Sequence, residues 1–391
     1  MLNMRQKIAL SGEVGRRYRS KSKKEKSKIL DEFVQNTGYN RSYARRILGN
    51  LKTRGRKRKH ILRKRIYDAS VFYPLKTLWI AADNICGKRL KPFIPELLRI
   101  LIRDKNLRVN KKERAKLETV SASTIDRMLA HVKKSYQLKG RSTTKPGTLL
   151  RSTIPIKMFS DWDEKRPGFF EADLVALCGD SVRGDYVNAL NLTDVATGWE
   201  GLEAFMGKGQ YRTEKAVNII RSRLPFPLLG IDSDNGVEFI NWLLKAYCEK
   251  NNISFTRIRP YRKNDNCYVE QKNYTVVRRF LGYGRCETDK QLFLVQDALK
   301  LIELYVNFFQ PVMKMESKQR IESHVKKVYD NAKTPYQRLK NLGVLNEEKK
   351  GELEVLYESL NPLDLRKKIY KLMEKLNRTF RYKINDATNT N

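Results

Sequence analysis

The spacing of hydrophobic residues changes along the chain, from a helical period to the short apolar runs of strands. Before residue 136, apolar side chains recur every three or four positions, as at Ile29, Phe33 and Val34. That spacing is typical of amphipathic helices. From Phe169 onward, short apolar runs bounded by turn residues alternate with helical stretches. The pattern therefore predicts helical modules first and a domain of mixed helices and strands after them.

The second half of this pattern predicts a particular sheet. Three strands follow one another from Phe169, with a turn at Thr197-Gly198, which indicates a meander. Helix and strand then alternate, so we expect a five-stranded mixed sheet with helices on both faces. This strand order is that of a ribonuclease-H-like domain. The predicted strands are 169–177, 185–198, 199–207, 226–233 and 253–260, and the predicted helices are 212–224, 236–251, 265–283 and 289–309.

Residues 26–48 have the order of a helix-turn-helix, namely a helix, a glycine turn and a short second helix. Gly38 ends the first helix, and Asn40 can cap the second. Ser42, Arg45 and Arg46 would then lie on the outer side, available to DNA. A plain helical hairpin with a solvated basic face is the alternative, and this segment alone does not decide between them.

Residues 66–135 are predicted to contain further helices. One helix is expected to end at Gly87, and the last one, 121–134, resembles a capped recognition helix. We expect Ser123 to be its N-cap, with Asp126 three residues later. Ile125, Met128, Leu129 and Val132 would face inward, and Thr124, Arg127 and His131 would face outward, available to DNA. His131 alone is expected to be a surface residue and not a metal ligand.

Charge identifies the class of partner. The chain of 391 residues has 80 Lys and Arg against 43 Asp and Glu, a net charge of +37. Such an excess raises repulsion within the folded state, so we expect a polyanionic partner. Nucleic acid is the first interpretation and a membrane surface the second, and no apolar run approaches the roughly 20 residues that span a bilayer.

The densest cationic run is 51–65, LKTRGRKRKHILRKR. Arginines placed like these can enter a narrow minor groove. The alternative is a solvated linker that touches phosphates without reading sequence. The candidate DNA contacts in this run are Arg54, Arg56, Lys57 and Arg58.

Cysteine and histidine usage argues against a zinc or disulfide framework. The five cysteines are scattered, no CxxC occurs, and the chain has three histidines. A reducing compartment fits this usage, and the N-terminus lacks the apolar region of a signal peptide. We therefore expect a cytoplasmic protein.

Three acids stand where the predicted sheet would bring its segments together. Asp173 lies within the first strand, Asp234 directly follows the fourth strand, and Glu270 lies early on the helix predicted over 265–283. The first and fourth strands are expected to be neighbours, with the helix packed across their ends. The alternative is three unrelated surface acids.

Clustered carboxylates repel one another, so three of them need a cation. Hard oxygen ligands select Mg²⁺ or Mn²⁺. Two such ions, roughly 3.5–4 Å apart, can activate an attacking oxygen and stabilise a leaving oxygen at phosphorus. Attack by water would cut DNA, and attack by a 3′-hydroxyl would join two strands.

The motifs around these acids resemble those of the retroviral-integrase and DDE-transposase superfamily. They are EADLVAL, LTDVATGW, DSDNGVEF and KNDNCYVEQKN, with 35 residues between Asp234 and Glu270. Together with the basic helical modules and LYVNFFQPVMK, they resemble a bacterial insertion-sequence transposase. The resemblance implies that Asp173, Asp234 and Glu270 are catalytic metal ligands for two Mg²⁺ or Mn²⁺ ions. One departure is that the histidines cannot build the zinc module of retroviral integrases, so the helix-turn-helix modules must recognise DNA ends.

Other residues near the acids have open roles. Asp232 could lie near the metal or be solvated at the strand end, and Glu171 could support Asp173 or pair with a cation. Trp199 is expected to be a core aromatic, with base stacking as the alternative. On the Glu270 helix, Lys272, Asn273 and Arg278 are candidates to hold DNA, against a solvated face packed by Tyr274 and Val277.

Altogether the chain is predicted to be multidomain. The predicted segments are an N-terminal helix-turn-helix with a basic tail (1–65), a second helical DNA-binding module (66–135), a basic linker (136–168), the catalytic core (169–312) and a basic helical C-terminal region (313–391). The expected function is transposition of DNA, with a non-catalytic DNA-binding protein or a metal-dependent nuclease as alternatives. Double-stranded DNA, as element ends and as target, and a homo-oligomer of two or more subunits are the expected partners.

Overall fold

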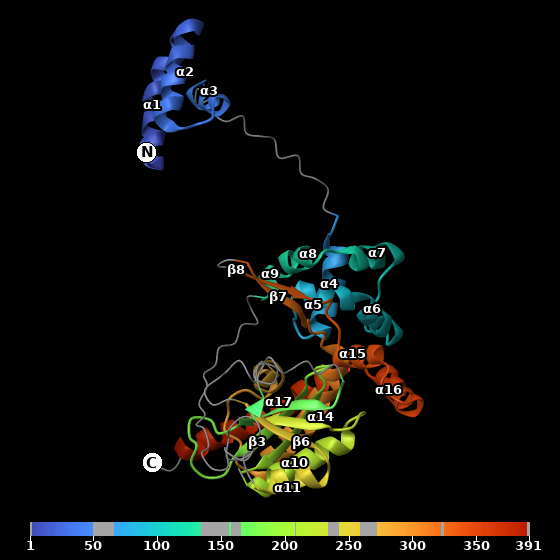
Figure 1. The fold of residues 1–391 in the computed structure, drawn as a ribbon. Helices are drawn as coiled ribbons and strands as arrows, with labels where there is room; N and C mark the ends of the chain where they lie inside the picture. Colours follow the sequence, from blue (N-terminus) through green and yellow to red (C-terminus); the bar gives the residue numbers. More distant parts are fainter. Residues whose placement is uncertain are drawn as a thin grey trace. The chain divides into compact units, whose positions relative to one another are not determined.

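The computed structural model contains two compact units, Met1–Ile66 and Tyr67–Asn391, shown in Figure 1. The structure describes residues 2–49, 66–133, 156–157, 166–207, 209–233, 242–258, 272–321 and 324–388. Each unit has its own hydrophobic core.

The first unit is a three-helix bundle formed by α1 (Met4–Arg19), α2 (Lys23–Thr37) and α3 (Arg41–Gly49). Gly38 caps α2 in the left-handed conformation, with φ 68°, and the Asn40 side chain accepts a hydrogen bond from the Ser42 amide at 2.9 Å. Both predicted caps are confirmed. Helix α1, which was not predicted from the sequence, supplies Tyr18 to the shared core.

The second unit is built on a six-stranded sheet with the order β1-β6-β5-β2-β3-β4. The strands β2, β3 and β4 form the predicted antiparallel meander, and β5 and β6 add to β2 in parallel. This is the predicted ribonuclease-H-like order, with one short strand from the predicted linker added beside β6. The strands are β1 (Ile156–Lys157), β2 (Phe169–Ala176), β3 (Val187–Asp194), β4 (Glu200–Met206), β5 (Gly230–Ser233) and β6 (Ser254–Ile258).

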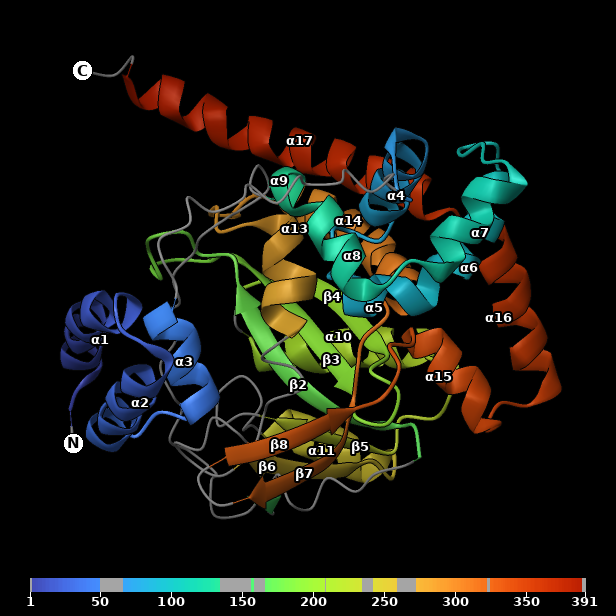
Figure 2. The same cartoon turned by 90° about the horizontal axis from the view of Figure 1, so that it is seen from above.

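Helices flank the sheet as expected (Figures 1 and 2). The helices α10 (Gln210–Arg223) and α11 (Trp242–Lys250) pack together, against β4 and β6 respectively. The long helix α14 (Asp289–Phe309) packs against β4, which is the edge strand of the sheet in the described part of the chain.

Side chains of α14 form hydrogen bonds with the backbone groups at this edge of β4. Asn307 and Glu303 accept hydrogen bonds from the β4 amides of Glu200 and Leu202, each at 2.8 Å, and the Gln296 amide donates to a β4 carbonyl. A covered edge cannot recruit a further strand, so α14 closes the sheet on that side.

The predicted helices of 66–135 are present with different ends. They are α4 (Ala69–Ala81), α5 (Gly87–Leu90), η1 (Lys91–Phe93), α6 (Ile94–Arg103), α7 (Lys111–Thr119), α8 (Ala122–Met128) and α9 (Ala130–Lys133). Gly87 begins α5 and does not end α4, which ends at Ala81. A side chain at position 87 would collide with the Ala122 carbonyl oxygen, so the close approach to α8 requires a glycine there.

The predicted cap of the last of these helices is also wrong. Ser121, not Ser123, caps α8, accepting from the Thr124 amide at 3.2 Å. Asp126 plays no part in this cap, because its carboxylate accepts from the Gly87 amide at 2.9 Å and pairs with Lys133.

The region 313–391, which is predicted to be helical, begins instead with a β-hairpin between α14 and the last helices. Its strands are β7 (Met315–Ile321) and β8 (His324–Tyr329), and the helices α15 (Pro335–Leu342), α16 (Glu347–Ser359) and α17 (Pro362–Thr388) follow. The helical C-terminal region is therefore confirmed only after the hairpin.

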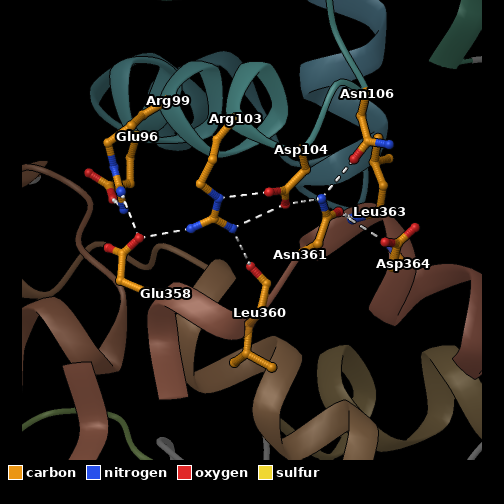
Figure 3. Close-up of polar contacts among 10 residues, drawn as sticks. All are labelled: Glu96, Arg99, Arg103, Asp104, Asn106, Glu358, Leu360, Asn361, Leu363 and Asp364. Carbon is orange, nitrogen blue, oxygen red and sulfur yellow. Dashed lines mark hydrogen bonds and ion pairs between the residues drawn. The ribbon is translucent and has the colours of Figure 1, made fainter. Parts of the chain in front are cut away.

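Polar contacts join the C-terminal helices to the helical module (Figure 3). Glu358 on α16 accepts from Arg99 and Arg103 of α6 at 2.9 and 2.8 Å. Asn361, before α17, donates to Asp104 and Asn106.

One hydrophobic cluster runs from Val71 to Leu376, so the helical module, the sheet and α14–α17 share a core. The division of this unit into separate domains stays a prediction. Within the described ranges, no helix is both long and apolar enough to cross a membrane.

Candidate active site

Asp173 lies half-buried in the middle of β2 and is held from two sides. Its Oδ1 accepts from the Leu174 amide at 2.8 Å, and its Oδ2 accepts from Nδ2 of Asn273 at 2.5 Å. Oδ1 of Asn273 in turn accepts from Nδ2 of Asn191 at 3.0 Å. Because Asn191 pairs with Asp173 across β2 and β3, the three side chains connect this strand pair to the segment that follows Glu270.

The strand of Asp232 lies directly beside β2, as predicted. In the parallel ladder Glu171 pairs with Asp232 and Ala172 pairs with Ser233. Glu171 and Asp232 are almost fully buried, at 0% and 2% exposure, and Asp232 accepts from the Thr256 hydroxyl at 2.5 Å. Solvation at a strand end is therefore the wrong interpretation of Asp232.

The segment after Glu270 is anchored through Lys272, whose ammonium forms an ion pair with Glu200 on β4. The Thr193 hydroxyl donates to the other carboxylate oxygen of Glu200 at 2.9 Å. Burial raises the pKa of Glu200, and the neighbouring Lys272 charge opposes that shift. Lys272 is 9% exposed, so its charge is directed into the protein.

From Asn273 the chain forms the π-helical turn η5 (Asn273–Arg278), followed by α13 (Arg279–Leu281). Such turns are often found at functional sites, because the extra residue alters which side chains share a face. Arg278 donates to the Ala176 carbonyl at the end of β2 at 2.8 Å, while Tyr274 is 51% exposed and Val277 is buried.

The structure places the other described candidates on helices. Arg45 and Arg46 are exposed on α3, with the Arg46 guanidinium 5.2 Å from the centre of the Tyr43 ring. Arg127 is exposed on α8 and donates to the Thr124 hydroxyl at 3.2 Å. The predicted site residues that lie outside the described residues are Asp234, Glu270, Arg54, Arg56, Lys57 and Arg58.

Two aromatic environments agree with the sequence analysis. Trp199 is 6% exposed and packs edge-on against Phe226 and Phe308, so it is a core residue. The exposed His131 ring stacks on Phe72 at 5.8 Å. Within the described part of the chain, no group of three or more His, Cys, Asp or Glu side chains is arranged to hold a metal.

Two residues of this site, Asn191 and Glu200, were not predicted from the sequence. Each is a fully buried polar residue within a strand. A charged residue between apolar neighbours, as in WEGLEAF, is a weak signal of a buried partner. Nothing in the sequence identifies Lys272 as that partner.

No protein-family model matches the chain. Among solved structures, the catalytic core domain of BIV integrase is 17% identical with a TM-score of 0.29, over 45% of this chain and 95% of that one. The HTLV-2 integrase catalytic core domain, in complex with magnesium, is 16% identical with a TM-score of 0.30, over 44% and 95%. A simian T-cell lymphotropic virus intasome is 14% identical with a TM-score of 0.31, over 50% and 64%. The strand order and register, and not these likenesses, define the fold.

A curated relative covers most of the chain. This relative, the uncharacterized protein y4rM of Sinorhizobium fredii, is 39% identical over 314 residues. The match covers 80% of this chain and 89% of that protein. At this identity and coverage, the chain belongs to the same protein family as y4rM.

Proposed function

We propose that this protein is a DNA transposase that cuts DNA 3′ ends and joins them to target DNA, using Asp173, Asp234 and Glu270. The observation that carries the proposal is the hydrogen bond from Asn273 to Asp173. In the helix predicted over 265–283, Asn273 would follow Glu270 by about one turn. A contact at Asn273 therefore supports a position for Glu270 near the same strand.

The register of β2 and β5 supports the third member of the site. The last described pair is Ala172 with Ser233. We propose that the ladder continues by one more pair, which would bring Asp234 beside Asp173. The buried acids Glu171 and Asp232 precede these two residues at the same spacing on each strand.

An all-carboxylate donor set suits Mg²⁺ or Mn²⁺, because hard cations prefer oxygen ligands. Two such ions, when bound by Asp173, Asp234 and Glu270, would supply activation of the attacking oxygen and stabilisation of the leaving oxygen. The chain's own contribution is orientation. Asn273 holds the Asp173 carboxylate, and the ion pair of Lys272 with Glu200 fixes the start of the segment that holds Asn273.

DNA binding is proposed for the basic helices and for the cationic run 51–65. Arg45, Arg46 and Arg127 are exposed, as such contacts require. Lys272 and Arg278 are engaged by Glu200 and by the Ala176 carbonyl, so we propose that they act by positioning the segment after Glu270. Because transposition joins two DNA ends, we propose a dimer or larger assembly acting on bacterial DNA in the cytoplasm.

The test is a cleavage and joining assay with duplexes that carry the sequences flanking the gene, a supercoiled target plasmid and Mg²⁺. The full-length protein should release 3′-hydroxyl ends and join them to the plasmid. Asp173→Asn and Glu270→Gln should bind the same duplex and do neither. Cutting without joining would favour a nuclease, and equal cutting by all three proteins would show that the acids are not catalytic.

A further inference from the structure

Among the residues that the structure describes, β7 and β8 pair only with each other and form a two-stranded ribbon. Side chains pointing to both faces are exposed, including Met315, Val328 and Tyr329 at 40%, 41% and 46%. A two-stranded ribbon without a covering layer has little stability in water. The ribbon therefore needs either a strong attachment or a partner.

The attachment lies at its base. Asp330 accepts from the Lys314 amide at 2.7 Å and from the Arg338 guanidinium at 2.6 Å, and Arg338 also donates to the Val312 carbonyl at 2.7 Å. The Lys314 ammonium donates to the carbonyls of the turn after β3, including Ala196 at 2.6 Å. These contacts fix where the ribbon leaves the sheet domain, so little order would have to be created when it binds a partner.

The charge of the ribbon indicates the partner. Its strands contain four cations, Lys318, Arg320, Lys326 and Lys327, and one acid, Glu316. In the register Lys318 pairs directly with Lys327, and Gln319 pairs with Lys326. Four cations against one acid leave the two strands with an excess of positive charge, which favours an anionic partner.

We propose that the ribbon is a DNA-binding arm that docks on a duplex, a site that rests on the proposed function but is separate from the acidic site. The major groove, about 12 Å wide, admits a two-stranded ribbon. Lys326 and Lys327 are adjacent and exposed, so their side chains can reach phosphates on both sides of the strand. Val328 and Tyr329 offer apolar contact to bases or sugars.

The experiment compares the full-length protein with Lys326→Gln/Lys327→Gln, measuring affinity for a fluorescein-labelled duplex of arbitrary sequence over a range of salt, without divalent metal. The matched control is Lys349→Gln/Lys350→Gln on α16. It removes the same charge from two adjacent exposed lysines, whose ammonium groups are already held by Glu352 and Glu347.

Each phosphate contact contributes about 0.9 to the slope of log affinity against log salt, so loss of two contacts should lower that slope by about 2. The control should keep the wild-type slope. Equal slopes for wild type and Lys326→Gln/Lys327→Gln, or an equal fall in both variants, would overturn the ribbon as a DNA arm. If the wild type binds no duplex, both the DNA-binding ribbon and the proposed function are wrong. If the wild type binds and the Lys326→Gln/Lys327→Gln variant binds with the same slope, only the proposal for the ribbon is wrong.

Discussion

Asn273 and Asp173 are 100 positions apart in the chain, yet the amide of Asn273 donates directly to the Asp173 carboxylate. This bond connects the strand with the first acid of the proposed site to the segment that follows the third. Partners that orient a metal ligand typically change metal affinity or activity by about 10- to 100-fold when removed.

Asn273→Ala should therefore lower Mg²⁺-dependent DNA cutting by about 10- to 100-fold and raise the Mg²⁺ concentration that cutting requires. Asn188→Ala is the matched control, because Asn188 is a buried strand amide that donates to the carbonyls of Tyr186 and Gly207, away from Asp173. If both variants lose activity equally, at equal loss of stability, Asn273 has only a structural role.

The ion pair of Lys272 with Glu200 makes a prediction about stability. Lys272→Met would leave the fully buried Glu200 without its counter-ion, which should cost about 3–5 kcal/mol in the free energy of unfolding. Adding Glu200→Gln to that variant removes the uncompensated charge, so it should restore a large part of the loss. Urea unfolding of the two variants measures both effects, and equal stability of the single and double variants would contradict the pairing.

Asp83 connects three parts of the second unit. Asp83 follows the C-cap of α4. Its carboxylate forms ion pairs with Arg279 of α13 at 2.8 Å and with Arg366 of α17 at 3.1 Å. Asp83→Asn should lower the free energy of unfolding by about 3–5 kcal/mol, because the buried Arg366 guanidinium loses its counter-charge and the more exposed Arg279 loses its ion pair.

Hydrogen exchange can show whether the loss of stability in Asp83→Asn extends through the whole second unit. If the unit has one core, amides of α4 and of β3 should lose protection together in Asp83→Asn. The exposed Asp364→Asn on α17, which loses a surface pair with Lys367, should change stability by less than about 1 kcal/mol. Loss of protection confined to α4 would contradict a shared core.

Glu303 makes stability depend on pH. Burial raises its pKa from 4.5 to about 7, against the opposing charge of Arg223. Between these values the unfolded chain releases a proton that the folded protein retains, so folding stability falls as pH rises. One pKa unit corresponds to about 1.4 kcal/mol, so the contribution lost across this range is about 3 kcal/mol.

In Glu303→Gln, the side chain cannot ionise but can still accept a hydrogen bond from the Leu202 amide. The free energy of unfolding of this variant should therefore lack the decrease with rising pH that Glu303 causes. The measurement is thermal or urea unfolding of both proteins at pH 5 and pH 8. The stability of wild type relative to Glu303→Gln should be lower at pH 8 than at pH 5. A constant difference between them would show that Glu303 is ionised throughout.

The sequence predicted the sheet well because its strands are buried and bounded by turn residues. Helix α14 was predicted with both ends correct, since Thr288 caps it and its apolar face is continuous. The neighbouring positions of Asp173 and the strand ending at Ser233 followed from the strand order.

Other features left no signal in the sequence. The ribbon of β7 and β8 is exposed on both faces, so it lacks the alternation of apolar and polar residues that identifies a strand. The position of Asp126 fits a capping pattern, but its carboxylate accepts a hydrogen bond from the amide of Gly87, which is distant in sequence. The ion pair of Lys272 with Glu200 likewise depends on tertiary packing, which no local pattern encodes.

Diffraction at the manganese absorption edge, from crystals of the full-length protein soaked in Mn²⁺, tests the central claim most directly. We expect anomalous density coordinated by the carboxylates of Asp173, Asp234 and Glu270, and its loss in Asp173→Asn. Crystals in which these three carboxylates lie in separate neighbourhoods, with no manganese between them, would contradict the account.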